Sequence, residues 1–105
     1  MRIQDLEERW REGECEIVLL PTLAREGRVT HFSVEVRCGG RERVFIVSED
    51  PVCGKRIKVF DVVSEPGRLP HFRPRDAAID LDYESLKELI GKRGAKAVAE
   101  RLLSG

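Results

Sequence analysis

The sequence lacks the short motifs that identify most enzymes. It contains no G-x-S-x-G nucleophile elbow, no H-E-x-x-H zinc motif and no glycine-rich phosphate loop that ends in Lys-Ser or Lys-Thr. Its only histidines are His31 and His71, and either one can be placed as a base beside Asp61 or Asp76. A chain with 19 carboxylates permits such pairings by chance. These absences favour a non-enzymatic protein.

Cysteine is scarce. The chain has three cysteines, Cys15, Cys38 and Cys53, and none of them form a C-x-x-C pair. A secreted disulfide scaffold normally has an even number of cysteines at a higher density. Together with His31 and His71 they are numerous enough for a tetrahedral zinc site, but structural zinc sites use much shorter spacings. We therefore expect no metal and no other cofactor. On an apolar strand face, Cys38 is interpreted as a small hydrophobic residue.

Long apolar runs are also missing. The longest aliphatic run is Ile17-Val18-Leu19-Leu20, far short of the roughly 20 residues that a membrane helix needs. The first ten residues, MRIQDLEERW, do not contain the apolar core of a signal peptide. These features, with the cysteine pattern, predict a cytoplasmic protein without a membrane partner.

Charged residues make up 36% of the chain, yet the 19 basic and 19 acidic residues cancel. No global field therefore attracts nucleic acid or anionic lipid. Residues 1–50 carry eight basic and eleven acidic residues, and residues 51–105 carry eleven and eight. Arginine outnumbers lysine fourteen to five and asparagine is absent. This composition is typical of proteins that work at high temperature, although a GC-rich genome also raises arginine.

The amino-terminal residues predict a helix. Ile3, Leu6 and Trp10 fall on one helical face, and most of the remaining positions are charged. Gly13 is a natural stop because glycine readily takes the left-handed conformation past a helix end. We interpret Trp10 as a buried anchor that pins this helix to a sheet.

From residue 15 to residue 63 the apolar pattern has the period of two that strands require. Turn signals interrupt it at Glu26-Gly27 and, more strongly, at Gly39-Gly40. The expected strands are 15–23, 28–38, 42–49 and 55–63.

The double glycine defines a register that can be checked against the side chains. A two-residue loop at 39–40 pairs residues whose numbers sum to 79. The resulting pairs are Arg37 with Glu42, Val34 with Phe45, and Phe32 with Val47. Charged residues therefore pair on one face and apolar residues on the other, and a slip by one residue would mismatch both faces.

The polar face of this hairpin carries two apolar residues, Val44 and Ile46. They predict partial cover of that face by a helix, by the Pro-rich segment or by a second copy of the protein. A helix of the same chain is the favoured interpretation.

Residues 65–82 contain Pro66, Pro70 and Pro74 and predict a long connecting loop. Asp82 then has the features of a helix N-cap, and two helical patterns follow. The expected fold is a single α+β domain over residues 1–105. It comprises a four-stranded antiparallel β-meander with an N-terminal helix and two C-terminal helices.

The strongest candidate for nucleic-acid binding is a basic element between the two C-terminal helical patterns. It comprises Gly91, Lys92, Arg93 and Gly94, with Lys96 one turn further on. Glycine lets a backbone approach a phosphate, and a helix start attracts an anion. Over residues 85–103 the element resembles the GxxG loop of KH RNA-binding domains, which implies contacts to a nucleic-acid backbone. The favoured interpretation is nevertheless a helix that ends at Gly91 and is followed by a solvated basic turn.

The Pro-rich loop is a second candidate, because Arg73 and Arg75 lie close to the aromatic Phe72. Guanidinium groups interleaved with an aromatic ring can pair with phosphates and stack on bases. In the favoured interpretation Leu69 and Phe72 pack the loop onto the sheet, and the arginines remain in water.

These observations predict a small non-enzymatic binding or regulatory module that acts through protein–protein contacts or self-association. Its expected interaction surface includes Val44, Ile46 and Phe72. The alternative is a nucleic-acid-binding protein that uses the helix-GKRG-helix element on RNA or DNA.

Overall fold

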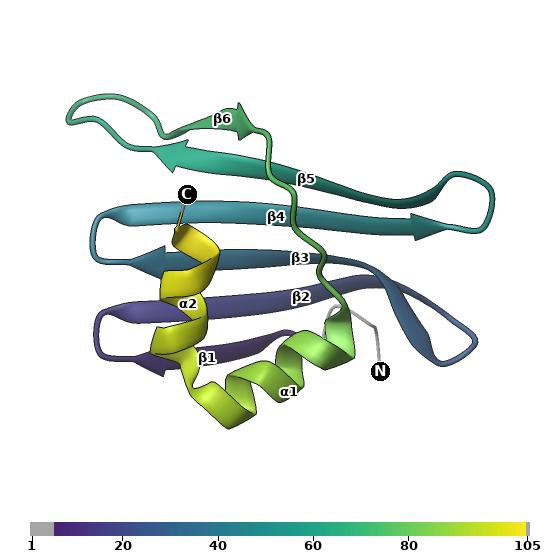
Figure 1. Ribbon diagram of the computed structural model, residues 1–105. Helices are drawn as coiled ribbons and strands as arrows, with labels where there is room; N and C mark the ends of the chain where they lie inside the picture. Colours follow the sequence, from purple (N-terminus) through teal and green to yellow (C-terminus); the bar gives the residue numbers. More distant parts are fainter. Residues whose placement is uncertain (1–5, 105) are drawn as a thin grey trace.

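The computed structural model describes residues 6–104. Six strands form one antiparallel sheet in the order of the chain, and two helices follow (Figure 1). The elements are β1 (Glu8–Glu12), β2 (Cys15–Arg25), β3 (Arg28–Cys38), β4 (Arg41–Asp50), β5 (Gly54–Val63), β6 (His71–Arg75), α1 (Tyr83–Arg93) and α2 (Ala95–Leu103).

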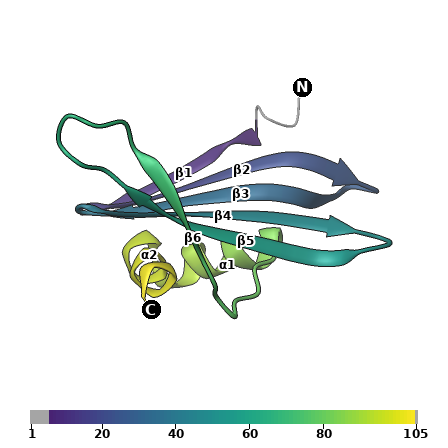
Figure 2. The ribbon, with the colours of Figure 1, turned by 90° about the horizontal axis from the view of Figure 1, so that it is seen from above.

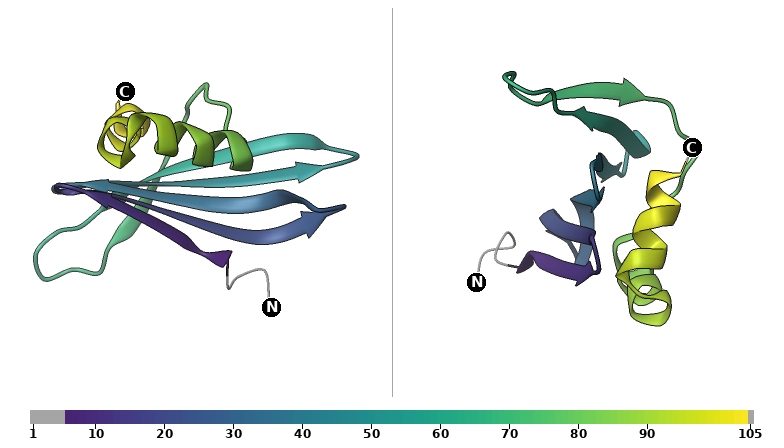
Figure 3. Two further views of the ribbon diagram at one scale, coloured as in Figure 1. Left: turned by 90° about the horizontal axis from the view of Figure 1, so that it is seen from below. Right: turned by 90° about the vertical axis from the view of Figure 1, so that its left-hand side faces the viewer.

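The molecule has two layers. Both helices lie on one face of the sheet, and the opposite face carries no helix (Figure 2). Strand β1 and the turn end of the β5–β6 hairpin bend away from the helices, toward that opposite face (Figure 3). The helix side is called the covered face below, and the other side the open face.

The central hairpin is confirmed. Phe32 pairs with Val47, Val34 with Phe45, and Arg37 with Glu42, as a turn at Gly39-Gly40 requires. Gly39 has a φ of 59°, a conformation that glycine adopts without strain. The four strands expected between residues 15 and 63 are present, with ends that differ by no more than two residues.

The predicted N-terminal helix is wrong. Ile3 lies outside the described residues, and Glu8–Glu12 form strand β1, which pairs with the start of β2 through a turn at Gly13. Three apolar residues at helical spacing were too few to outweigh the hydrogen bonds that this segment gains at the sheet edge. Trp10 is nevertheless half-buried and packs against the core, so it anchors a strand instead of a helix.

The predicted loop over residues 65–82 is also wrong in part, because His71–Arg75 form strand β6. Pro74 does not prevent this, since an edge strand can accept a residue without an N–H group. Leu69 does not pack on the sheet, because it is 88% exposed. Together with β1, β6 makes the sheet six-stranded instead of four-stranded.

The two helices follow one another with a single residue between them. Asp82 caps α1 as expected, and its carboxylate accepts a hydrogen bond from the Ser85 N–H. The expected stop at Gly91 is wrong, because α1 continues through Gly91 to Arg93 and ends at Gly94. No helix within residues 6–104 is long and apolar enough to cross a membrane.

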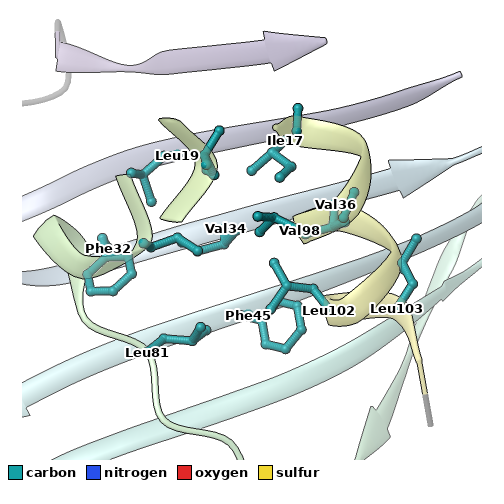
Figure 4. Packing of buried hydrophobic residues seen from close by; sticks show 14 of the residues in the cluster. Ile17, Leu19, Phe32, Val34, Val36, Phe45, Leu81, Val98, Leu102 and Leu103 are labelled. Carbon is teal, nitrogen blue, oxygen red and sulfur yellow. The ribbon is translucent and has the colours of Figure 1, made fainter. Parts of the chain in front are cut away.

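The core lies between the helices and the covered face. Ile17, Val34 and Phe45 from the strands meet Val98 and Leu102 of α2 (Figure 4), and all five are at most 7% exposed. At the start of α1, the Tyr83 ring packs edge-on against Phe32, with centroids 5.5 Å apart. The helices bury an otherwise apolar sheet surface, which is the main source of stability in such a layered domain.

A disulfide joins Cys15 and Cys38, which are direct register partners on β2 and β3. The interpretation of Cys38 as a simple hydrophobic residue is therefore wrong. The signal was present in the sequence. A two-residue turn at Glu26-Gly27 pairs residues whose numbers sum to 53, and 15 and 38 satisfy this sum.

Candidate interaction surface

The open face carries apolar side chains over strands β4, β5 and β6. Val44 is opposite Phe60 on β5, and Val62 is opposite Phe72 on β6, so all four project from the same side of the sheet as Ile46. The Phe60 and Phe72 rings contact each other edge-on, with centroids 6.3 Å apart. Ile46 is 44% exposed and Phe72 is 60% exposed. This set of five residues is called the apolar patch.

The structure corrects the expected cover of this patch. The sequence predicts that a helix of the same chain covers Val44 and Ile46, but both helices lie on the other face of the sheet (Figure 2). Sequence reasoning missed Phe60 and Val62, because the register of β4 with β5 was not predicted. The alternation of side chains along β5 could have identified them. Val59 faces the core, so Phe60 beside it faces the opposite side of the sheet, as does Val62.

The other half of the open face is charged and internally paired. The Glu16 carboxylate forms ion pairs with three arginines. Its oxygens lie 2.6 Å from Nη2 of Arg11, 3.2 Å from Nη2 of Arg37 and 3.9 Å from Nη1 of Arg9. The hydrogen bond from Arg11, aided by the charges of Arg37 and Arg9, holds the pKa of Glu16 below its ordinary value. Arg37 has two register partners, Glu16 on β2 and Glu42 on β4, and its ion pair is with Glu16. This region is suited to contact with water.

Both edges of the sheet are poorly suited to adding another strand. Strand β1 is short and charged, with the sequence ERWRE. Strand β6 has five residues and contains Pro74, which lacks the N–H group that a further strand would need. Short, charged or proline-containing edges are common devices against edge-to-edge association. The open face is therefore better suited to association than either edge.

On the covered face, the buried Arg43 ties the sheet to the carboxyl end of α2. Its Nε donates to Asp61 at 2.7 Å, and its Nη1 donates to the carbonyl oxygens of Leu102 at 3.0 Å and Ser104 at 3.2 Å. Arg75 donates to the other Asp61 oxygen at 3.1 Å. Burial opposes the charged form of Asp61, but the two arginines outweigh it, and its pKa lies below the ordinary value. The cluster is structural, since its cations satisfy the helix end and a carboxylate.

The GKRG element does not form a loop. Gly91, Lys92 and Arg93 belong to α1, and only Gly94, with a φ of 88°, interrupts the helices. At the start of α2, the Glu12 carboxylate of β1 accepts a hydrogen bond from the Lys96 N–H at 3.0 Å. A Cβ atom on Gly94 would lie 2.8 Å from the same Glu12 oxygen. An internal carboxylate therefore occupies the position at which a phosphate would meet the helix.

The basic residues of the two nucleic-acid candidates are not brought together. Lys92, Arg93 and Lys96 lie at the α1–α2 junction, near the β1 edge, whereas Arg73 and Arg75 lie on β6 at the opposite edge (Figure 1). Six strands at about 4.8 Å spacing separate the two edges by roughly 24 Å. Arg75 is in addition bound to Asp61.

The covered side has a groove of about 770 Å³ between α2 and the segment that precedes α1. Apolar residues such as Ile79 and Leu89 line it, with Arg75 and Arg101, and neither histidine does. His31 instead hydrogen-bonds to Thr30, and Asp61 is bound by the two arginines. Within residues 6–104, no cluster of His, Cys, Asp and Glu is arranged to hold a metal ion.

No protein-family model matches the chain, and the searches of curated proteins and of solved structures found no match either.

Proposed function

We propose that the protein is a non-enzymatic binding or regulatory module that acts by docking its open sheet face against another protein surface. One observation carries the proposal: the apolar patch remains accessible, with Ile46 and Phe72 exposed, although the chain has two helices to cover a sheet face. Exposed apolar residues that form one contiguous set indicate an interaction site more often than scattered ones do. Aromatic residues such as Phe72 are also enriched in protein interfaces.

The nucleic-acid alternative has less support. The Glu12 carboxylate at the start of α2 repels a phosphate, and the candidate arginines and lysines lie over opposite edges of the sheet. The formal net charge of zero adds no long-range attraction to a polyanion.

The cytoplasmic location is part of the same proposal. A disulfide is uncommon in a reducing cytosol, but intracellular proteins of hyperthermophiles are an exception. The arginine-rich composition without asparagine supports an organism that grows at high temperature.

Site-specific photo-crosslinking in the producing cell tests the proposal. A photoreactive phenylalanine analogue is placed at Ile46 and, as a matched control, at Val52, which is 91% exposed but lies in the β4–β5 turn. We expect a discrete adduct, identified by mass spectrometry, from position 46 and none from position 52. A second probe at Phe72 should lose its adduct when Ile46→Asp is added, but keep it with Val52→Asp. Equal labelling from positions 46 and 52 would refute the proposal.

A further inference from the structure

We infer that the surface docked on the open face is a second copy of this chain, related by a two-fold axis, an inference that rests on the proposed function. Two charged residues flank the apolar patch. Glu35 on β3 is the register partner of Val44, and Lys58 on β5 is the register partner of Ile46. An acid and a base thus lie on opposite sides of β4, on the open face.

Neither charge is neutralised by an ion pair in the described part of the chain. Among residues 6–104, Glu35 and Lys58 form no ion pair, whereas the neighbouring Glu16 binds three arginines. Both residues are exposed. Two unpaired opposite charges beside an accessible apolar surface are what an electrostatically complementary partner requires.

The placement of these charges suits a copy of the same face. The apolar side chains run diagonally across three strands, from Val44 on β4 to Phe72 on β6. A two-fold axis close to this diagonal, in the plane of the interface, places Glu35 of one copy near Lys58 of the other, within reach of the two long side chains. It therefore brings Glu35 of each copy to Lys58 of the other and buries Phe72 against its own equivalent. Such a self-complementary contact is the usual form of a symmetric dimer interface.

Two further features favour a second copy. The formal net charge is zero, so two copies do not repel each other at long range. The short, charged β1 edge and the proline-containing β6 edge disfavour strand addition, the mode of association that competes with face-to-face contact.

Charge reversal in the full-length protein tests the inference by sedimentation velocity. Like charges that face each other in an interface weaken it strongly. Glu35→Lys alone and Lys58→Glu alone should each weaken dimerisation at least tenfold. An equimolar mixture of the two variants should recover the dimer, as should the double variant, because opposite charges again meet. Glu88→Lys and Lys92→Glu on α1 are the matched controls, and they should leave the dimer unchanged.

Recovery in the mixture also shows that each single variant is folded. A wild-type chain that stays monomeric up to millimolar concentration would overturn the inference, and so would single variants that dimerise normally. A crosslinked adduct between Ile46 and a different protein would overturn it as well, but would leave the proposed function standing. Absence of any adduct at Ile46 would instead refute the proposed function.

Discussion

The covered and open faces are built from alternate residues of the same strands, yet they differ in role. On β4, Phe45 and Val47 are 1% exposed beneath the helices, whereas Ile46 between them is 44% exposed. The covered face holds the disulfide and the arginine cluster that fastens α2. The open face holds the apolar patch and the paired charges around Glu16. One strand can therefore supply folding stability and an accessible apolar surface through positions one residue apart.

The largest expected effect comes from neighbouring positions on β4. Phe45→Ala should lower the free energy of unfolding by about 4 kcal/mol, because it leaves a cavity under α2. Ile46→Ala should lower it by less than about 1 kcal/mol in dilute protein, because its side chain is largely in water. Urea denaturation of the two variants measures the contrast. Equal losses would mean that the two faces are covered alike.

The disulfide should contribute about 3 kcal/mol, since it closes a loop of 23 residues in the unfolded chain. Replacing both Cys15 and Cys38 by Ala should therefore lower the unfolding free energy by this amount. Cys53→Ala, which removes the exposed free cysteine, is the control and should have no effect. Thiol titration of the denatured protein should find one thiol without reductant and three with it. Three thiols before reduction would contradict the pairing.

The Asp61 cluster should make the covered face sensitive to acid. Asp61→Asn weakens the hydrogen bonds from Arg43 and Arg75 and should cost about 2 kcal/mol at neutral pH. Because the pKa of Asp61 is lowered by folding, its contribution is complete above its unfolded pKa of about 3.9 and is lost as the pH falls through the folded value.

The stability difference between wild type and Asp61→Asn should thus be constant from pH 6 to 8 and shrink below about pH 4. Asp76→Asn, which removes a nearby exposed carboxylate, is the control and should not change this profile. Thermal unfolding at a series of pH values provides the measurement. A difference that grows in acid would contradict the assignment.

The smallest effect is expected at the α1–α2 junction. Lys92→Ala with Arg93→Ala should change stability by less than about 0.5 kcal/mol, because both side chains are exposed at the end of α1. It should also leave the salt dependence of retention on immobilised RNA and DNA unchanged. If the slope of log affinity against log salt concentration fell by about two ions, the binding surface would be the helix side and not the open face.

Much of the sheet was predictable because its signals are local. The turn at Gly39-Gly40 and the alternation around it define β3 and β4, and the confirmed pair Val34–Phe45 shows that the predicted register is correct. Of the candidate site, Val44, Ile46 and Phe72 were predicted, and all three belong to the apolar patch. Phe60 and Val62 were not, since their face depends on the register across the β4–β5 turn.

The errors fall where a weak local pattern competed with a non-local partner. Residues 8–12 and 71–75 become strands only because β2 and β5 supply hydrogen bonds at the two edges. Gly91 has a low helix propensity, yet it lies within α1. The helix ends instead at Gly94, which lies beside Glu12, a residue 82 positions earlier in the sequence. Short-range spacing contains no information on such partners.

Short stretches of sequence encoded the turns at Glu26-Gly27 and Gly39-Gly40 and the division of β3 and β4 into two faces, since these depend on φ preferences and on the period of two. Short stretches did not encode which face of the sheet the helices cover. Apolar residues occur on both faces, and the outcome depends on the total apolar area that strands β2 to β5 present together to α1 and α2. That sum exists only after the sheet has formed, so the exposure of Ile46 and Phe72 is a property of the tertiary structure.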